Sequence, residues 1–238
     1  MNPSGKKAVV LGGTSGIGLA TARQLMEAGA HVVAVSRSDS NAAGARQALG
    51  DAADIRQVDV LDREAMAGLF EQLAPFDILV NAATGGERAT GPFLQMDLDG
   101  FQGSFRKLWG YVNSVRIGAP HMAEDGCITL VSGSPARKCP PGFAAISSVG
   151  NAVEGFVRAV ATEIVPRRIN AVSPGFIDTP MFPVEGEARE KFLAQATAGN
   201  LIKRPGTADE VAEAILFTIR NDFVTGTTVD VDGGALLP

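Results

Sequence analysis

The chain has 238 residues, a formal net charge of −5 at pH 7 and a hydrophobic fraction of 45%. Such a mild negative charge gives no basis for binding nucleic acid or an anionic membrane surface, and no apolar run reaches the roughly 20 residues that span a bilayer. Two cysteines and two histidines, which do not cluster, indicate neither a disulfide framework nor a structural metal site. We therefore expect a globular protein of the reducing cytoplasm.

Strand and helix patterns alternate from the start of the chain. An apolar strand at 8–11 is followed by a glycine-rich turn and a helix that ends near Gly29, a residue suited to the end of a helix. Asp62 is placed to cap a later helix. In this first half we expect further strands at 31–36, 54–60 and 76–81, helices at 43–49 and 62–73, a loop at 82–92 and a long helix at roughly 97–122.

The second half continues the alternation. Apolar residues recur at intervals of three and four between positions 146 and 160, which is one face of a helix. Alternating strands and helices predict an α/β fold, with a doubly wound parallel sheet of about seven strands and helices on both faces. Without a linker, repeat or low-complexity tract, residues 1–238 are predicted to form one domain. Its remaining elements are expected as strands at 127–132, 169–173 and 227–231 and a helix at about 208–220, with a mixed segment up to 199.

A glycine-rich turn joins the first strand to the first helix. Glycines let the backbone turn sharply and let a phosphate approach the main chain, while the start of the helix offers free N–H groups and the positive end of its dipole. We interpret the turn as a pyrophosphate-binding loop, with a plain turn as the alternative. Gly12, Gly16 and Gly18 would shape it, and Ser15 and Ile17 would lie beside the phosphates.

The sequence resembles the short-chain dehydrogenase/reductase family along nearly its whole length. Besides the glycine turn, the resemblance is carried by Asn81-Ala82-Ala83-Thr84-Gly85, by Asn170-Ala171-Val172-Ser173-Pro174-Gly175 with Thr179, and by Thr225-Gly226 and Asp232-Gly233-Gly234. The resemblance implies a Rossmann-type, three-layer αβα fold, a nicotinamide cofactor and a homo-oligomer, either a tetramer or a dimer.

The same resemblance implies which residues contact the cofactor. Asp59 and Val60 would lie at the adenine, with a loop cap as the alternative for Asp59. Asn81 would lie near the nicotinamide ribose, or it ties backbone groups between strands. The other residues implied for the nicotinamide side are Ala82, Ala83, Pro174, Gly175, Ile177 and Thr179.

The end of the second strand predicts which nicotinamide cofactor is bound. An acidic residue there would pair with the ribose hydroxyls of NAD, but this chain has Ser36-Arg37-Ser38. A guanidinium can bind a 2′-phosphate through two hydrogen bonds, whereas a carboxylate would repel it. We therefore predict NADP(H), with Arg37 and either Thr14 or Ser36 at the 2′-phosphate; a merely solvated Arg37 is the alternative.

The expected catalytic centre is incomplete. The family combines Asn, Ser, Tyr and Lys, with the Tyr and Lys one helical turn apart so that both face the cofactor. Here Ser132, or Ser134 after one step, supplies the serine, but Ile146 and Gly150 hold the Tyr and Lys positions. Shifting the alignment by one residue puts Ala145 and Val149 at these positions, so neither the Tyr nor the Lys is restored. The place of the asparagine holds Lys107.

Three alternative proton donors remain in the sequence. Lys107 and Tyr111, the only tyrosine, are four residues apart, so Lys107 would lower the pKa of Tyr111 or donate directly. A salt-bridged lysine and an interface tyrosine are the alternative. Lys138, beside Arg137, would reach the ribose or the substrate oxygen unless the two form an ordinary exposed loop pair. Ser147 and Ser148 adjoin the vacant Tyr position but lack a base, so we interpret them as polar groups near the start of a helix.

The segment 177–201 is predicted to cover the substrate. The residues expected on its apolar inner face, unless they serve a subunit contact, are Met181, Phe182, Pro183, Val184 and Phe192. Ile146 and Gly150 in place of Tyr and Lys also make the pocket less polar, which indicates an apolar substrate. The leading hypothesis is an NADP(H)-dependent oxidoreductase that acts on a carbonyl or alcohol, with Ser132 polarising the oxygen and a non-standard proton donor. The alternatives are an NADP(H)-binding sensor or partner subunit without hydride chemistry, or a lyase or isomerase on the same fold.

Overall fold

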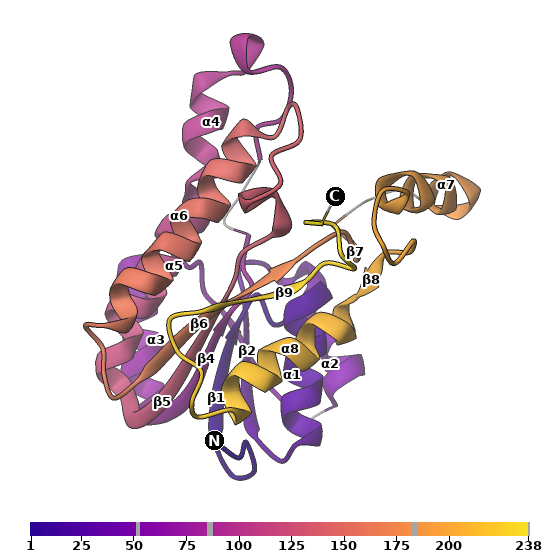
Figure 1. Ribbon diagram of the computed structural model, residues 1–238. Helices are drawn as coiled ribbons and strands as arrows, with labels where there is room; N and C mark the ends of the chain where they lie inside the picture. The colour runs from indigo at the N-terminus through magenta and orange to yellow at the C-terminus, as the bar shows by residue number, and fades with distance from the viewer. Residues whose placement is uncertain (51–52, 85–87, 182–184, 238) are drawn as a thin grey trace.

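The computed structural model describes residues 1–50, 53–84, 88–181 and 185–237. Within these residues, seven parallel strands form one sheet in the order β3-β2-β1-β4-β5-β6-β9, and a two-stranded ladder pairs β7 with β8 (Figure 1). The predicted doubly wound parallel sheet is therefore confirmed. The strands are β1 (Lys7–Leu11), β2 (His31–Ser36), β3 (Asp54–Gln57), β4 (Phe76–Asn81), β5 (Met122–Val131), β6 (Arg168–Pro174), β7 (Ile177–Asp178), β8 (Gly206–Thr207) and β9 (Thr228–Val231).

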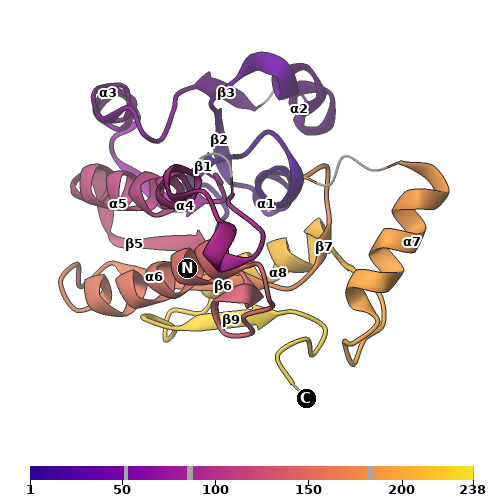
Figure 2. The ribbon, with the colours of Figure 1, turned by 90° about the horizontal axis from the view of Figure 1, so that it is seen from above.

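Helices cover both faces of the sheet. Seen from above, α3, α4, α5 and α6 lie on one side of the strands and α1, α2 and α8 on the other, with α7 beyond the second side (Figure 2). The helices are α1 (Gly16–Glu27), α2 (Ala42–Leu49), α3 (Arg63–Leu73), α4 (Leu98–Ser104), α5 (Arg106–Gly118), α6 (Ala144–Ala161), α7 (Gly186–Thr197) and α8 (Ala208–Arg220). None of them, in the part of the chain that the structure describes, combines the length and apolarity of a membrane-crossing helix.

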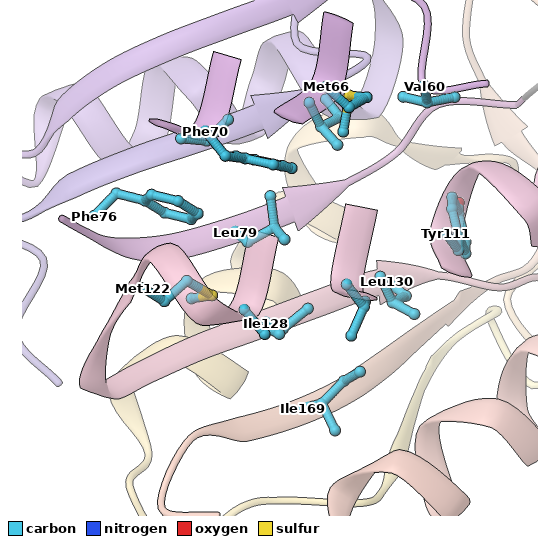
Figure 3. Packing of buried hydrophobic residues seen from close by; sticks show 14 of the residues in the cluster. Val60, Met66, Phe70, Phe76, Leu79, Tyr111, Met122, Ile128, Leu130 and Ile169 are labelled. Atoms are coloured by element: carbon cyan, nitrogen blue, oxygen red, sulfur yellow. The ribbon is translucent and has the colours of Figure 1, made fainter. Parts of the chain in front are cut away.

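The central strands are buried on both faces, which explains their continuous apolar runs. In β1, Val9 and Leu11 pack in the cluster under α3, α5 and α6, while Ala8 and Val10 pack in the cluster under α1 and α8. Figure 3 shows the first cluster, where Phe70 and Phe76 stack with ring centroids 5.3 Å apart. Burying each such large side chain stabilises the fold by about 1.5–3 kcal/mol.

The predicted long helix at 97–122 is divided in the structure. Asp97 caps α4 by accepting a hydrogen bond from the amide of Gly100 (2.7 Å), α5 follows after Phe105, and a 3₁₀ turn at Ala119–His121 ends the run. Pro120 cannot continue an α-helix because it lacks an amide N–H, so β5 begins at Met122, five residues earlier than predicted.

Two further differences concern short elements. Strand β3 ends at Gln57 because the chain then bends, and the carboxylate of Asp59 accepts a hydrogen bond from the amide of Leu61 (2.9 Å). The mixed segment contains β7 and α7, and β7 pairs with β8 far along the chain. Strands of two residues carry no periodicity in the sequence, so the prediction missed them.

Parallel strands bring all of their carboxyl ends to one edge of the sheet. The glycine turn after β1, the segments after β4 and β5, and Pro174 at the end of β6 therefore meet at this edge. Helices α4 and α7 rise beyond the same edge on opposite sides (Figure 1). The residues predicted from the sequence to form the site lie at this edge, where open α/β sheets bind their ligands.

Candidate cofactor cleft and active site

A cleft of about 670 Å³ opens over the carboxyl ends of β1, β2 and β3 and runs along the start of α1. Thirteen of the residues that the sequence predicts for cofactor binding line it. They are Gly12, Thr14, Ser15, Gly16, Ile17, Gly18, Ser36, Arg37, Asp59, Val60, Ala82, Ala83 and Thr179.

The glycine turn brings the start of α1 close beneath the cleft. Gly12 has φ +77°, and a Cβ on it would lie 2.8 Å from the amide nitrogen of Ala83. A Cβ on Gly18 would lie 2.1 Å from the carbonyl oxygen of Gly12. Ser15 occupies the N-cap position of α1 with extended backbone, but its hydroxyl makes no capping hydrogen bond. That hydroxyl and the first amides of the helix are therefore free for an anionic ligand.

Four residues predicted for cofactor binding do not line this cleft: Asn81, Pro174, Gly175 and Ile177. Asn81 is fully buried; its Nδ2 donates to the Ser114 hydroxyl (2.9 Å) and its Oδ1 accepts from the Ala83 amide (3.0 Å). These bonds hold the end of β4 against α5. Gly175 packs so closely on Asp232 that a Cβ would lie 2.7 Å from its Cα.

The end of the cleft beside β2 is polar and poor in acids. Arg37 is exposed, and its carbonyl accepts a hydrogen bond from Gln57 Nε2 (3.2 Å). Asp59 is the sole carboxylate among the described residues that line the cleft. The prediction missed Ser38, Ser40, Asn41 and Gly44, although this Ser- and Asn-rich stretch directly follows Arg37. The other lining residues that it missed are Leu19, Val35, Val58, Thr84 and Pro180, while Met181 was expected on the substrate cover.

The chain is similar to known proteins over nearly its whole length. A family model described as enoyl-(acyl carrier protein) reductase matches residues 12–235. The chain belongs to the short-chain dehydrogenase/reductase family. This family of oxidoreductases includes the 3-oxoacyl-(acyl-carrier-protein) reductase FabG of Haemophilus influenzae, which is 30% identical over 98% of this chain and 99% of its own.

Two further matches illustrate the range of this short-chain dehydrogenase/reductase family. A solved small-chain dehydrogenase in complex with NADPH has a TM-score of 0.83 and 31% identity, covering 99% of this chain and 100% of its own. The cyclic-di-GMP-binding biofilm dispersal mediator protein of Escherichia coli is 30% identical over 97% of both chains. The fold and the family are thus shared by proteins whose names describe different tasks.

Ile146 and Gly150 are the α6 positions at which the sequence resemblance leads us to expect Tyr and Lys. Ile146 is half-buried, and Gly150 is so close to the 3₁₀ turn at Ser134–Ala136 that a Cβ would lie 2.8 Å from the Cβ of Ala136. Asn151 donates a hydrogen bond to the carbonyl of Ala136, and Glu154 lies 3.5 Å from Arg137 Nε. This face of α6 therefore holds the loop after β5, here called the docked loop (residues 133–138).

Ser132 and Lys138 do not line the cleft, and both have hydrogen-bond partners within the protein. The buried Ser132 hydroxyl lies within reach of the carbonyl of Gly150 (3.3 Å) and the carboxylate of Glu154 (3.4 Å). A hydroxyl has one proton, so Ser132 donates to one of these oxygens at a time and must give up that bond to donate to a substrate oxygen. The exposed Lys138 donates from Nζ to the carbonyl of Ala235 (2.5 Å), near the C-terminus.

Lys107 and Tyr111 share a face of α5, as predicted. Lys107 Nζ donates to the carbonyl of Ser132 (3.0 Å) and lies 5.6 Å from the centre of the Tyr111 ring. The Tyr111 hydroxyl donates to the carbonyl of Val131 (2.8 Å), and its ring is buried near Leu130 in the core (Figure 3). Among the residues that the structure describes, Lys107 makes no salt bridge.

The two side chains differ in acidity. Burial, and then the positive charge of Arg88, lower the pKa of Lys107 to about 7. Burial raises the pKa of Tyr111, and this effect outweighs the opposing charge of Arg88. The expected lowering of the Tyr111 pKa is therefore wrong in direction, because the hydroxyl is enclosed by the core.

The predicted substrate cover lies only partly within the described residues. Met181 lines the cleft and is 48% exposed, and Phe192 of α7 packs edge-to-face on Phe176 with ring centroids 5.5 Å apart. Gly85 of the strand-end motif, and Phe182, Pro183 and Val184 of the cover, lie outside the described part of the chain. Where residues are described, no cluster of three metal-ligating side chains occurs.

Proposed function

We propose that the protein is an NADP(H)-dependent oxidoreductase that interconverts a carbonyl compound and its alcohol. The observation that carries the proposal is the cleft itself, in which a close-packed glycine turn leaves the Ser15 hydroxyl free and Arg37 exposed. The relative solved with NADPH supports the choice of cofactor. When bound, NADPH supplies the hydride.

Arg37 selects the phosphorylated cofactor, and the glycine turn holds the pyrophosphate. The guanidinium of Arg37 is suited to a 2′-phosphate, with Thr14 and Ser36 on the same cleft wall. The Ser15 hydroxyl and the first amides of α1 bind the pyrophosphate. Asp59 lies at the adenine end, where its carboxylate also accepts from the Leu61 amide.

Lys107 is the proton donor in this proposal. Its ammonium has three N–H groups, and in the described part of the chain one of them is bonded to the carbonyl of Ser132. A pKa of about 7 suits a general acid at neutral pH, because the acid is still partly protonated while transfer from it is easy. Nζ gives its proton to the substrate oxygen as that oxygen becomes an alcohol, and solvent reprotonates the amine.

The test is turnover with a panel of carbonyl compounds, followed by the absorbance of NADPH at pH 7. We expect NADPH oxidation with at least one class, and a fall in kcat of about 10²- to 10⁴-fold in Lys107→Met with NADPH affinity retained. Lys191→Met, on the surface of α7, is the matched control. Unchanged kcat in Lys107→Met would remove Lys107 from this role.

A second candidate is an NADP(H)-binding protein without hydride chemistry. The specific observation in its favour is the use of α6 for packing at Gly150, Asn151 and Glu154. A relative named for binding a cyclic dinucleotide supports a binding role in this family. Tight NADPH binding without turnover on any carbonyl class would favour this second function over the first.

A further inference from the structure

Hydrogen bonds hold the segment that carries Arg88 close to the start of α5, which carries Lys107. The amide of Ala89 donates to the hydroxyl of Ser104 (2.9 Å), which lies one helical turn before Lys107. The amide of Gly91 donates to the carbonyl of Gly142 (3.0 Å), just before α6 begins. Residues 88–91 are thereby held between the starts of α5 and α6. Arg88 is exposed there, and its charge acts on both Lys107 and Tyr111.

Neither cation has an acidic partner in the described residues. No salt bridge there includes Arg88 or Lys107. Two arginines elsewhere at the same edge of the sheet are paired: Arg137 with Asp230 and Glu154, and Arg189 with Asp178. Two neighbouring like charges repel each other, and a bound anion would remove that repulsion.

We propose that Arg88 and Lys107 form a binding site for a carboxylate carried by the substrate, which makes the substrate an oxo acid or the corresponding hydroxy acid. This assignment rests on the proposed oxidoreductase function and names its substrate class. A guanidinium binds a carboxylate through two parallel hydrogen bonds, so Arg88 contributes more of the binding free energy than Lys107 does. Lys107 retains N–H groups for the neighbouring carbonyl oxygen, to which it donates the proton.

The carboxylate also prepares Lys107 for its chemical role. With a pKa of about 7, the amine is only about half protonated at neutral pH before substrate binds. A negative charge close to the amine favours its charged form. The substrate that needs the proton therefore increases the protonated fraction of Lys107. A neutral ketone of similar shape does not have this effect.

The test measures binding of a simple anion without requiring turnover. Benzoate and the neutral isostere benzamide are titrated calorimetrically into the NADPH-loaded protein. We expect benzoate to bind at least about 10-fold more tightly than benzamide, and Arg88→Gln to weaken benzoate binding by about 10- to 100-fold, with partial recovery in Arg88→Lys. Arg116→Gln, at an exposed position of α5, should leave benzoate binding unchanged.

A second measurement separates this proposal from the proposed function. In turnover, Arg88→Gln should raise KM about 10- to 100-fold for an oxo acid and leave KM for its methyl ester unchanged. Equal binding of benzoate and benzamide, or benzoate binding that survives Arg88→Gln, overturns the anion site even if neutral ketones are reduced. Benzoate binding that depends on Arg88, without turnover of any carbonyl compound, supports the anion site and overturns the oxidoreductase.

Discussion

The cofactor cleft and the docked loop lie at the same edge of the sheet but use their polar groups in opposite ways. In the cleft, the Ser15 hydroxyl makes no capping bond and Arg37 is exposed. At the docked loop, Ser132 and Asn151 make their hydrogen bonds within the protein. Free polar groups mark the part of the edge that is suited to bind a ligand, and internally bonded groups mark the part that holds its own loop. Shared fold therefore supports cofactor binding better than it supports a particular chemistry.

The largest effect that tests this contrast is the pH dependence of turnover. Reduction requires the protonated form of Lys107, so with a neutral ketone its rate should be maximal below about pH 7 and fall about tenfold per pH unit above it. Alcohol oxidation requires the neutral amine, so its rate should rise with pH and level off above about pH 7. Steady-state rates in both directions check this, and two parallel pH profiles would contradict it.

The next effect concerns cofactor choice. Arg37→Gln should weaken NADPH binding by about 10- to 100-fold, because a charge-assisted contact with the 2′-phosphate is lost. NADH binding should change by less than about threefold, since NADH lacks that phosphate. Fluorescence titration with both cofactors measures the ratio, and Arg46→Gln on α2 is a control outside the cleft lining. Equal losses for NADPH and NADH would show that Arg37 contacts a shared part of the cofactor.

Restoring the family's residues should damage this protein. We expect Ile146→Tyr with Gly150→Lys to lower the free energy of unfolding by about 1–3 kcal/mol and to yield no increase in kcat. The reason is the contact of Gly150 with Ala136, where even a Cβ would approach within 2.8 Å. Urea unfolding and NADPH oxidation measure the two quantities. A stable double variant with higher kcat would mean that the docked loop can move to accommodate the two larger side chains.

The smallest effect compares two serines. Ser15→Ala should weaken NADPH binding a few-fold and leave the free energy of unfolding within about 0.5 kcal/mol, since Ser15 makes no capping bond. Ser132→Ala should lower the free energy of unfolding by about 1 kcal/mol and leave NADPH binding unchanged, because its hydroxyl bonds to α6. Chemical denaturation and cofactor titration check both. Loss of turnover in Ser132→Ala without loss of stability would return Ser132 to the catalytic role.

Features local in sequence were predictable from it. Strands β2 and β4 have the bounds expected from their apolar runs, and Asp62 caps α3 by accepting from the amides of Glu64 and Ala65. The glycine turn was recognisable because its steric demands act between near neighbours, such as Gly12 and Gly18. Most of the residues that line the cleft then followed from the ends of successive parallel strands.

Features that depend on distant contacts were not predictable. Lys107 was a candidate, but its bond to the carbonyl of Ser132 spans 25 residues. The enclosure of Tyr111 reverses the direction of its pKa shift, and no local pattern signals that burial. The proximity of Arg88 to Lys107 depends on the Ala89–Ser104 hydrogen bond. Tertiary packing decides which of these polar side chains is left for chemistry.

The contact between Gly150 and Ala136 also constrains the order in which substitutions can accumulate. A lysine introduced alone at position 150 would collide with the docked loop, so that single substitution is expected to be destabilising. The loop would first have to change its path, with the loss of its contacts to Asn151 and Glu154. A library meant to install Tyr and Lys on α6 therefore has to vary residues 133–138 together with positions 146, 150, 151 and 154.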